Sequence, residues 1–181
     1  MTQTIKAYIE AASLYQEHKN KLTEEHLKEI YLKKVSEYYD RHFTDLSRRE
    51  QLIEYITQNI LPHVKIEKDL VLKQALMEVN NALSHLNSAM NGVNSTEDNI
   101  KKANTHIQRA VLDCYKAIIK DLTFLNLVDN SFLKELKKLR ELEYSEIGSD
   151  KTSNRINIAN EYKKVVFKIL CQHQIIPKIV S

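Results

Sequence analysis

Glycine and proline are nearly missing from this chain: two of each occur among 181 residues, and tryptophan is absent. Proteins rich in strands, or built from alternating strands and helices, need many more of these residues in their turns. Gly92 and Gly148 lie far apart, so the chain contains no glycine-rich phosphate-binding loop. These absences exclude P-loop and dinucleotide-binding folds, and they favour long helices.

Cysteine and long apolar runs are also scarce. Cys114 and Cys171 both fall within apolar helical patterns, and two buried thiols in a chain of this size predict a reducing compartment without a disulfide framework. Residues 1–20 contain no apolar region of a secretory signal, and no run is long enough to cross a bilayer. We therefore expect a cytoplasmic protein with no membrane contact.

The residues that are present describe an ordinary globular protein, with 43% apolar residues, 28% charged residues and a net charge of +3. Apolar positions recur at helical spacing along almost the whole chain and predict about seven helices. The expected fold is all-α, an antiparallel bundle of about five core helices with extra N-terminal helices. Residues 1–62 are predicted to form those N-terminal helices, as an arm or subdomain, and residues 63–181 the bundle core.

Polar and small residues predict where several helices begin and end. Thr23 and Ser95 are expected to cap helices, and Ser47 with Glu50 has the spacing of a capping box. A helix over residues 64–91 is expected to end at Gly92. Its predicted core face comprises Leu72, Ala75, Leu76, Val79, Leu83, Leu86 and Met90.

The pair of helices predicted between Lys73 and Ile119 has the most informative pattern. Its polar residues lie among alanines, which allow two helix backbones to approach closely, so polar groups beside them would line the seam. His106, Arg109 and Asp113 follow at i, i+3 and i+7 and share one side of a helix. His85 occupies a similar flanking position on the preceding helix. We interpret these four residues as a partner-binding or phosphate-binding seam, with an ordinary surface ion pair of Arg109 and Asp113 as the alternative.

No pattern indicates a metal or cofactor. The chain has seven histidines, yet it contains neither Glu-x-x-His nor His-x-x-x-His, and His26 with Glu29 gives a single reversed match. Neither cysteine has the polar surroundings of a nucleophile, and no serine is flanked by glycines. We expect no metal, no cofactor and no catalytic residue of these kinds.

The C-terminal part of the chain is its most basic. From residue 150 onward six cationic residues stand against two acidic ones. This excess predicts either a solvated helix face or a surface that binds phosphate groups. The basic patch proposed for an anionic partner consists of Lys151, Arg155, Lys163, Lys164 and Lys168.

A longer pattern joins Asn-Asn-Ala-Leu-Ser-His-Leu at residues 80–86 to Ala103-x-x-His106-x-x-Arg109-Ala110-x-x-Asp113-x-Tyr115-Lys116. Over about 50 residues this resembles the core helical hairpin of HEPN-type proteins, which are bacterial helical bundles found beside nucleotidyltransferases and in defence systems. The Arg-x(4–6)-His motif of the ribonucleases in that superfamily is absent from this chain. The resemblance implies a non-catalytic member that is dimeric through a helical interface.

Three functions follow from these patterns. The leading one is a non-catalytic interaction module that binds a protein partner, a second copy or nucleic acid, as an accessory or antitoxin-like component of a toxin–antitoxin or phage-defence system. The second is a metal-independent ribonuclease that uses His85 and His106 as base and acid. The third is a purely structural oligomer subunit.

Overall fold

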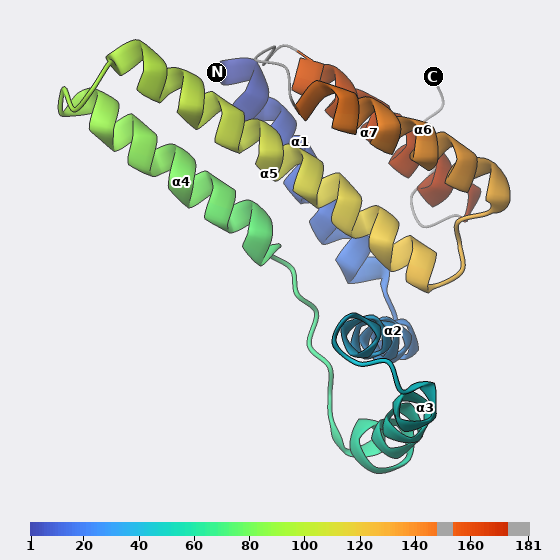
Figure 1. Cartoon of the computed structure of the whole chain (residues 1–181). Coiled ribbons are helices and arrows are strands. Elements are labelled where there is room, and N and C mark those ends of the chain that lie inside the picture. The colour runs from blue at the N-terminus through green and yellow to red at the C-terminus, as the bar shows by residue number, and fades with distance from the viewer. Residues whose placement is uncertain (148–153, 174–181) are drawn as a thin grey trace.

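The computed structural model describes residues 1–147 and 154–173, and these residues form seven α-helices and no strand (Figure 1). The all-α prediction is confirmed. The helices are α1 (Thr2–Lys21), α2 (Glu24–His42), α3 (Leu46–Tyr55), α4 (Lys73–Met90), α5 (Thr96–Phe124), α6 (Asn130–Ile147) and α7 (Asn154–Gln172). A π-helical turn, Ile56–Ile60, and a 3-10 turn, Leu61–His63, continue α3.

The bundle is organised around α5, the longest helix, which packs against α1, α4 and α7, while α6 packs against α7 (Figure 1). The main core contains Ala110, Ile118 and Leu122 of α5, none of which is measurably exposed, together with Val166 and Ile169 of α7. Burial of these apolar side chains is the main force that holds the helices together. The predicted antiparallel bundle with five core helices is confirmed.

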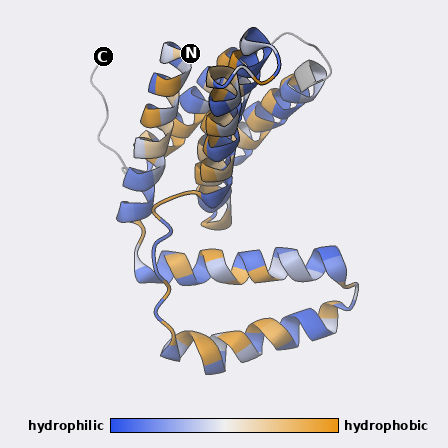
Figure 2. Cartoon of the chain, turned by 90° about the vertical axis from the view of Figure 1, so that its left-hand side faces the viewer, coloured by the Kyte–Doolittle hydropathy of each residue, from blue (hydrophilic) through white to orange (hydrophobic). Residues whose placement is uncertain are grey.

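The N-terminal arm is shorter than residues 1–62. Ala11, Leu14 and Tyr15 of α1 belong to the main core, so α1 is a bundle helix although the sequence placed it with the arm. Only α2 and α3 project, and Figure 2 shows them lying crosswise below the bundle. Sequence periodicity identifies an apolar face but cannot tell which neighbour covers it, and this explains the different boundary.

The arm is attached to the bundle by a small core of its own. Leu27 and Ile30 of α2 pack with Leu22, Phe124 and Leu125 at the end of the bundle. Residues 64–72 then return from the arm to α4 as an extended connector, so the helix predicted from residue 64 begins only at Lys73. Nine residues cover about 30 Å when extended but about 14 Å as a helix, so the extended connector lets the chain span a longer distance between arm and bundle.

Helix caps follow the sequence in part. Thr23 and Ser95 accept hydrogen bonds from backbone N–H groups three residues later, as predicted. The cap predicted at Ser47 is wrong, because Asp45 accepts the corresponding bond from the backbone of Arg48 at 3.1 Å. After α4, Gly92 has a φ of +66°, and this left-handed conformation lets the chain turn directly into α5.

Candidate functional site

The seam between α4 and α5 brings together the two histidines that the sequence singled out. The rings of His85 and His106 are stacked, with centroids 5.2 Å apart and planes inclined by 19°. They meet because α4 and α5 run antiparallel on either side of the turn at Gly92, and because Ala82 and Ala103 let the helices approach closely. Both rings are half-buried.

Each imidazole is oriented by one polar side chain. Nδ1 of His106 lies 2.5 Å from Oε2 of Glu78, and Nδ1 of His85 lies 3.3 Å from Oδ1 of Asn99. The amide nitrogen of Asn99 donates to the backbone oxygen of Val93 at 2.7 Å, so its oxygen faces His85. In this network both histidines carry the proton on Nδ1, and Nε2 remains able to accept one.

Glu78 and Asn99 are site residues that the sequence reasoning missed. Each lies seven residues before a histidine on its own helix, Glu78 before His85 and Asn99 before His106. Residues seven apart share a helix face, so this spacing was a usable signal. The pairing itself crosses between helices, because Glu78 contacts His106 and Asn99 contacts His85, and such a crossing depends on the tertiary structure.

Asp113 extends the seam, whereas Arg109 points into solvent. The two side chains form no ion pair within 4 Å, although both lie in the described part of the chain. Burial raises the pKa of Asp113 to about 6; Lys116 opposes this rise, Glu78 and Glu143 add to it, and Arg109 opposes it. The seam therefore contains a carboxyl group with a raised pKa on the same helix as one of its two imidazoles.

This arrangement is chemically capable of moving a proton. In many general bases a carboxylate accepts a hydrogen bond from Nδ1 of a histidine, and Nε2 on the other side of the ring takes the proton. The same contacts serve equally well as a buried polar network that fixes how two helices pack.

The outer face of α4, which lies beside the alanines that pack on α5, differs from its prediction. Leu76, Leu83 and Met90 were expected in the core but are 44%, 56% and 87% exposed. They are one heptad apart, and Asn80 and Asn87 lie between them, also exposed. The apolar residues of α4 spread over a wide part of its surface, and only α5 packs extensively against it. The prediction was wrong because an apolar pattern alone implies that every apolar side is buried.

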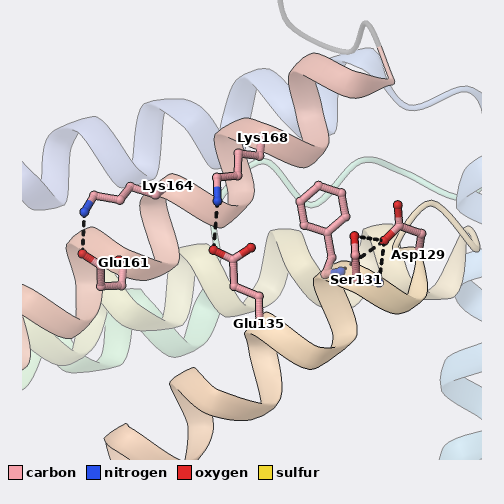
Figure 3. Close-up of polar contacts among 7 residues, drawn as sticks. Asp129, Ser131, Glu135, Glu161, Lys164 and Lys168 are labelled. Atoms are coloured by element: carbon pink, nitrogen blue, oxygen red, sulfur yellow. Dashed lines mark hydrogen bonds and ion pairs between the residues drawn. The ribbon is translucent and has the colours of Figure 1, made fainter.

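The basic patch predicted near the C-terminus lies partly outside the described residues, since Lys151 and the side chain of Arg155 are not among them. The three described lysines all contact carboxylates. Lys163 lies 2.7 Å from Glu10 of α1, and Figure 3 shows Lys164 and Lys168 beside Glu161 and Glu135, at 2.5 and 2.9 Å. These contacts offset the positive charge of the patch, which stays a prediction.

The part of the chain that the structure describes contains no metal site and no membrane-spanning helix, and its buried thiol at Cys114 is unreactive. No three His, Cys, Asp or Glu side chains there are placed to hold a metal ion. Burial raises the pKa of Cys114 to about 12, so its thiol is protonated and unreactive at neutral pH. None of the described helices combines the length and apolar character needed to cross a bilayer.

Comparisons with known proteins add no assignment, because no protein-family model, no curated protein and no solved structure matches the chain.

Proposed function

We propose that this protein is a non-catalytic interaction module that pairs with a second copy of itself along the outer face of α4, defined by Leu76, Asn80, Leu83, Asn87 and Met90. The observation that carries the proposal is the exposure of three large apolar side chains on one helix face. In Figure 2, where this side of the molecule faces the viewer, α4 lies at the front of the bundle. An accessory or antitoxin-like role in a toxin–antitoxin or phage-defence system, implied by the HEPN resemblance, belongs to this proposal.

The spacing of the face supports a helical partner. The five residues follow one another at intervals of four and three, which is the heptad spacing by which two helices pack side by side. The leucines and the methionine supply apolar contact, and the asparagines alternate with them. Asparagine at such positions favours a defined two-helix pairing, because its amide is satisfied by another amide across the seam.

The charge of the face supports a second copy as that partner. From Val79 to Thr96 the sequence contains no Asp, Glu, Lys or Arg, although 28% of the whole chain is charged. Identical charged faces repel each other, whereas an uncharged face with its own amide pairs can meet a copy of itself. A symmetric contact also places the same residues on both sides.

The experiment measures the oligomeric state by analytical ultracentrifugation. The unmodified protein is expected to be dimeric, and Leu83→Asp is expected to be monomeric because it places a carboxylate at the centre of the face. The matched control is Ile9→Asp on α1, whose side chain is equally exposed at 57% and lies outside the face. A monomeric parent protein, or a Leu83→Asp variant that still dimerises, contradicts the proposal.

The stacked histidines favour a second candidate, a metal-independent ribonuclease. Their ring centroids are 5.2 Å apart, within reach of one phosphate group. Incubation of the purified protein with labelled single-stranded RNA tests this function. Cleavage that is lost in both His85→Ala and His106→Ala supports it, whereas intact RNA, or cleavage that survives both changes, rejects it.

A further inference from the structure

A groove lies where α2 of the arm meets α5 and α6, on a different side of α5 from α4. Its volume is about 580 Å³. No linear sequence pattern marks it, because its residues come from the four helices α2, α5, α6 and α7 and span the chain from Glu37 to Tyr162. The groove has positively charged walls and an apolar floor. A matching ligand therefore has both negative charge and an apolar surface.

The two long walls have the same design. On the α5 wall, Lys116 and Lys120 stand on either side of Ile119. On the α6 wall, Lys137 and Arg140 follow Leu133 and Leu136 at helical spacing. Leu133 is 44% exposed, so part of the floor is uncovered apolar surface. Each wall thus presents cations beside an aliphatic strip.

The lining of the groove has more positive than negative charge, although Lys116 is in direct contact with Glu143 of α6. Five cationic side chains line it, the fifth being Arg41 of α2, and Glu37 is the single carboxylate among the lining residues. Glu37 lies 2.7 Å from Lys120 and 3.4 Å from Arg41. One carboxylate therefore already binds between two of these cations, and it shows which chemistry the walls accept.

The aromatic residues of the groove are not available for stacking on bases. The ammonium group of Lys120 lies 5.2 Å from the ring centre of Phe124, and that of Lys116 lies 5.8 Å from the ring centre of Tyr162. Both rings are almost fully buried. Proteins that bind single-stranded nucleic acids combine cations for the phosphates with open aromatic faces for the bases. Because this groove has the cations without such faces, it suits carboxylates and aliphatic side chains better.

We propose that the groove binds an acidic amphipathic helix of a protein partner. The apolar stripe of such a helix would lie on Ile119, Leu133 and Leu136, and its flanking Glu or Asp side chains would meet the cations of the two walls. This is the helix-in-groove mode of recognition, in which anchors at i, i+3/i+4 and i+7 enter an apolar trough. The site is separate from the outer face of α4 and does not depend on pairing there.

The position of Glu37 gives the proposal a specific consequence. Glu37 contacts two cations of the groove and so competes with the carboxylates of a bound helix. Glu37→Gln removes this competitor while keeping the side-chain size. Binding of an acidic helix is therefore expected to become several-fold tighter, an effect that a merely structural ion pair would not produce.

The test uses fluorescence anisotropy with a synthetic amphipathic peptide of about 18 residues, long enough for five helical turns, with leucines on one face and glutamates on both flanks. The probes for comparison are a scrambled peptide of the same composition and a single-stranded oligouridylate. Lys137→Glu with Arg140→Glu reverses the α6 wall. Lys134→Glu with Lys138→Glu is the matched control, because it makes the same charge change on exposed lysines of α6 outside the groove.

We expect at least tenfold tighter binding of the amphipathic peptide than of the scrambled one, loss of that binding in the α6-wall variant, and retention in the control, with the fold of each verified by circular dichroism. Leu83→Asp is expected to bind normally, which separates this inference from dimerisation. Equal binding of both peptides, absence of binding, preference for the oligouridylate, or weaker binding by Glu37→Gln would each overturn the proposal.

Discussion

Two aspartates on α5, only eight residues apart, have pKa values shifted in opposite directions. Asp121 is buried beside His18 and Lys19 of α1, with Nε2 of His18 3.4 Å from its carboxylate and the ammonium of Lys19 in direct contact. Burial alone raises its pKa, but these two partners outweigh burial and lower it. Asp113 is only half-buried, and its pKa is nevertheless raised to about 6.

The difference shows that burial raises the pKa at both sites, and that only the partners of Asp121 are strong enough to reverse this effect. Asp121 faces two groups that are cationic or can become so, which stabilise its ionised form. Asp113 has two carboxylates, Glu78 and Glu143, as well as cations in its surroundings. Asp121 therefore acts as a fixed ionic link between α1 and α5, whereas Asp113 responds to pH.

Asp121→Asn is expected to be the most damaging change. It leaves Lys19, which is 4% exposed, as a buried cation without a counter-charge, and such a loss costs about 3–5 kcal/mol of unfolding free energy. Urea denaturation at pH 7 measures it. Because the pKa of Asp121 is lowered by folding, its contribution is complete at neutral pH and is lost as the pH falls through the acid range. A cost below about 1 kcal/mol would remove the contrast.

Asp113→Asn is expected to stabilise the protein at pH 7 by about 1–2 kcal/mol, after allowance for partial solvent screening. Folding raises the pKa of this carboxyl to about 6, so the ionised form is disfavoured in the folded state at neutral pH. The penalty shrinks as the pH falls below 6 and is gone once the pH is below the unfolded value of 3.8, where the group is protonated in both states. Denaturation curves at pH 7 and pH 4 should show the gain only at pH 7; a gain of equal size at both values would point to another cause.

Glu78→Gln sharpens the comparison by removing one negative neighbour of Asp113. The pKa of Asp113 is expected to fall below its present value of about 6, since Glu78 is among the groups that raise it. The amide oxygen of glutamine still accepts the hydrogen bond from Nδ1 of His106, so the seam keeps its geometry. An NMR titration of the Asp113 carboxyl carbon measures the change, and an unaltered midpoint would exclude Glu78 as a cause.

Lys168→Ala sets the lower limit of these effects. Its contact with Glu135, at 2.9 Å, joins two side chains that are 57% and 41% exposed, and exposed pairs contribute about 0–1 kcal/mol. Thermal unfolding of the variant should therefore differ little from that of the parent protein. A loss approaching that of Asp121→Asn would mean that exposure does not govern the strength of ion pairs in this bundle.

Much of the fold was predictable because it depends on local patterns. The scarcity of glycine and proline, the helical spacing of apolar residues and the caps at Thr23 and Ser95 all act over a few residues. The errors concern which helix faces are buried by a neighbouring helix. Leu83 and Met90 have the spacing of core residues but face outward, and α1 belongs to the bundle. A periodic pattern identifies a face without identifying its neighbour.

The candidate sites divide in the same way. His85 and His106 stood out in the sequence because each lies beside alanines on a helix that leads to or from one tight turn, and antiparallel pairing then places them at similar heights. Glu78 and Asn99 were missed, although their spacing of seven from the histidines was available. The basic groove had no linear signal, because Arg41, Lys120 and Arg140 approach one another only in the folded chain.

Local preferences of the chain are enough to specify long helices and one tight turn at Gly92, since those properties depend on backbone preferences and on the spacing of apolar residues. Which charges meet depends on how the helices pack in the folded protein. Lys19 and Asp121 are 102 residues apart yet in contact, Asp113 lies near Glu78 of another helix, and Glu37 reaches Lys120 across the arm. Electrostatic energy depends on the distance between charges in space, and the separation of two residues along the chain does not predict that distance.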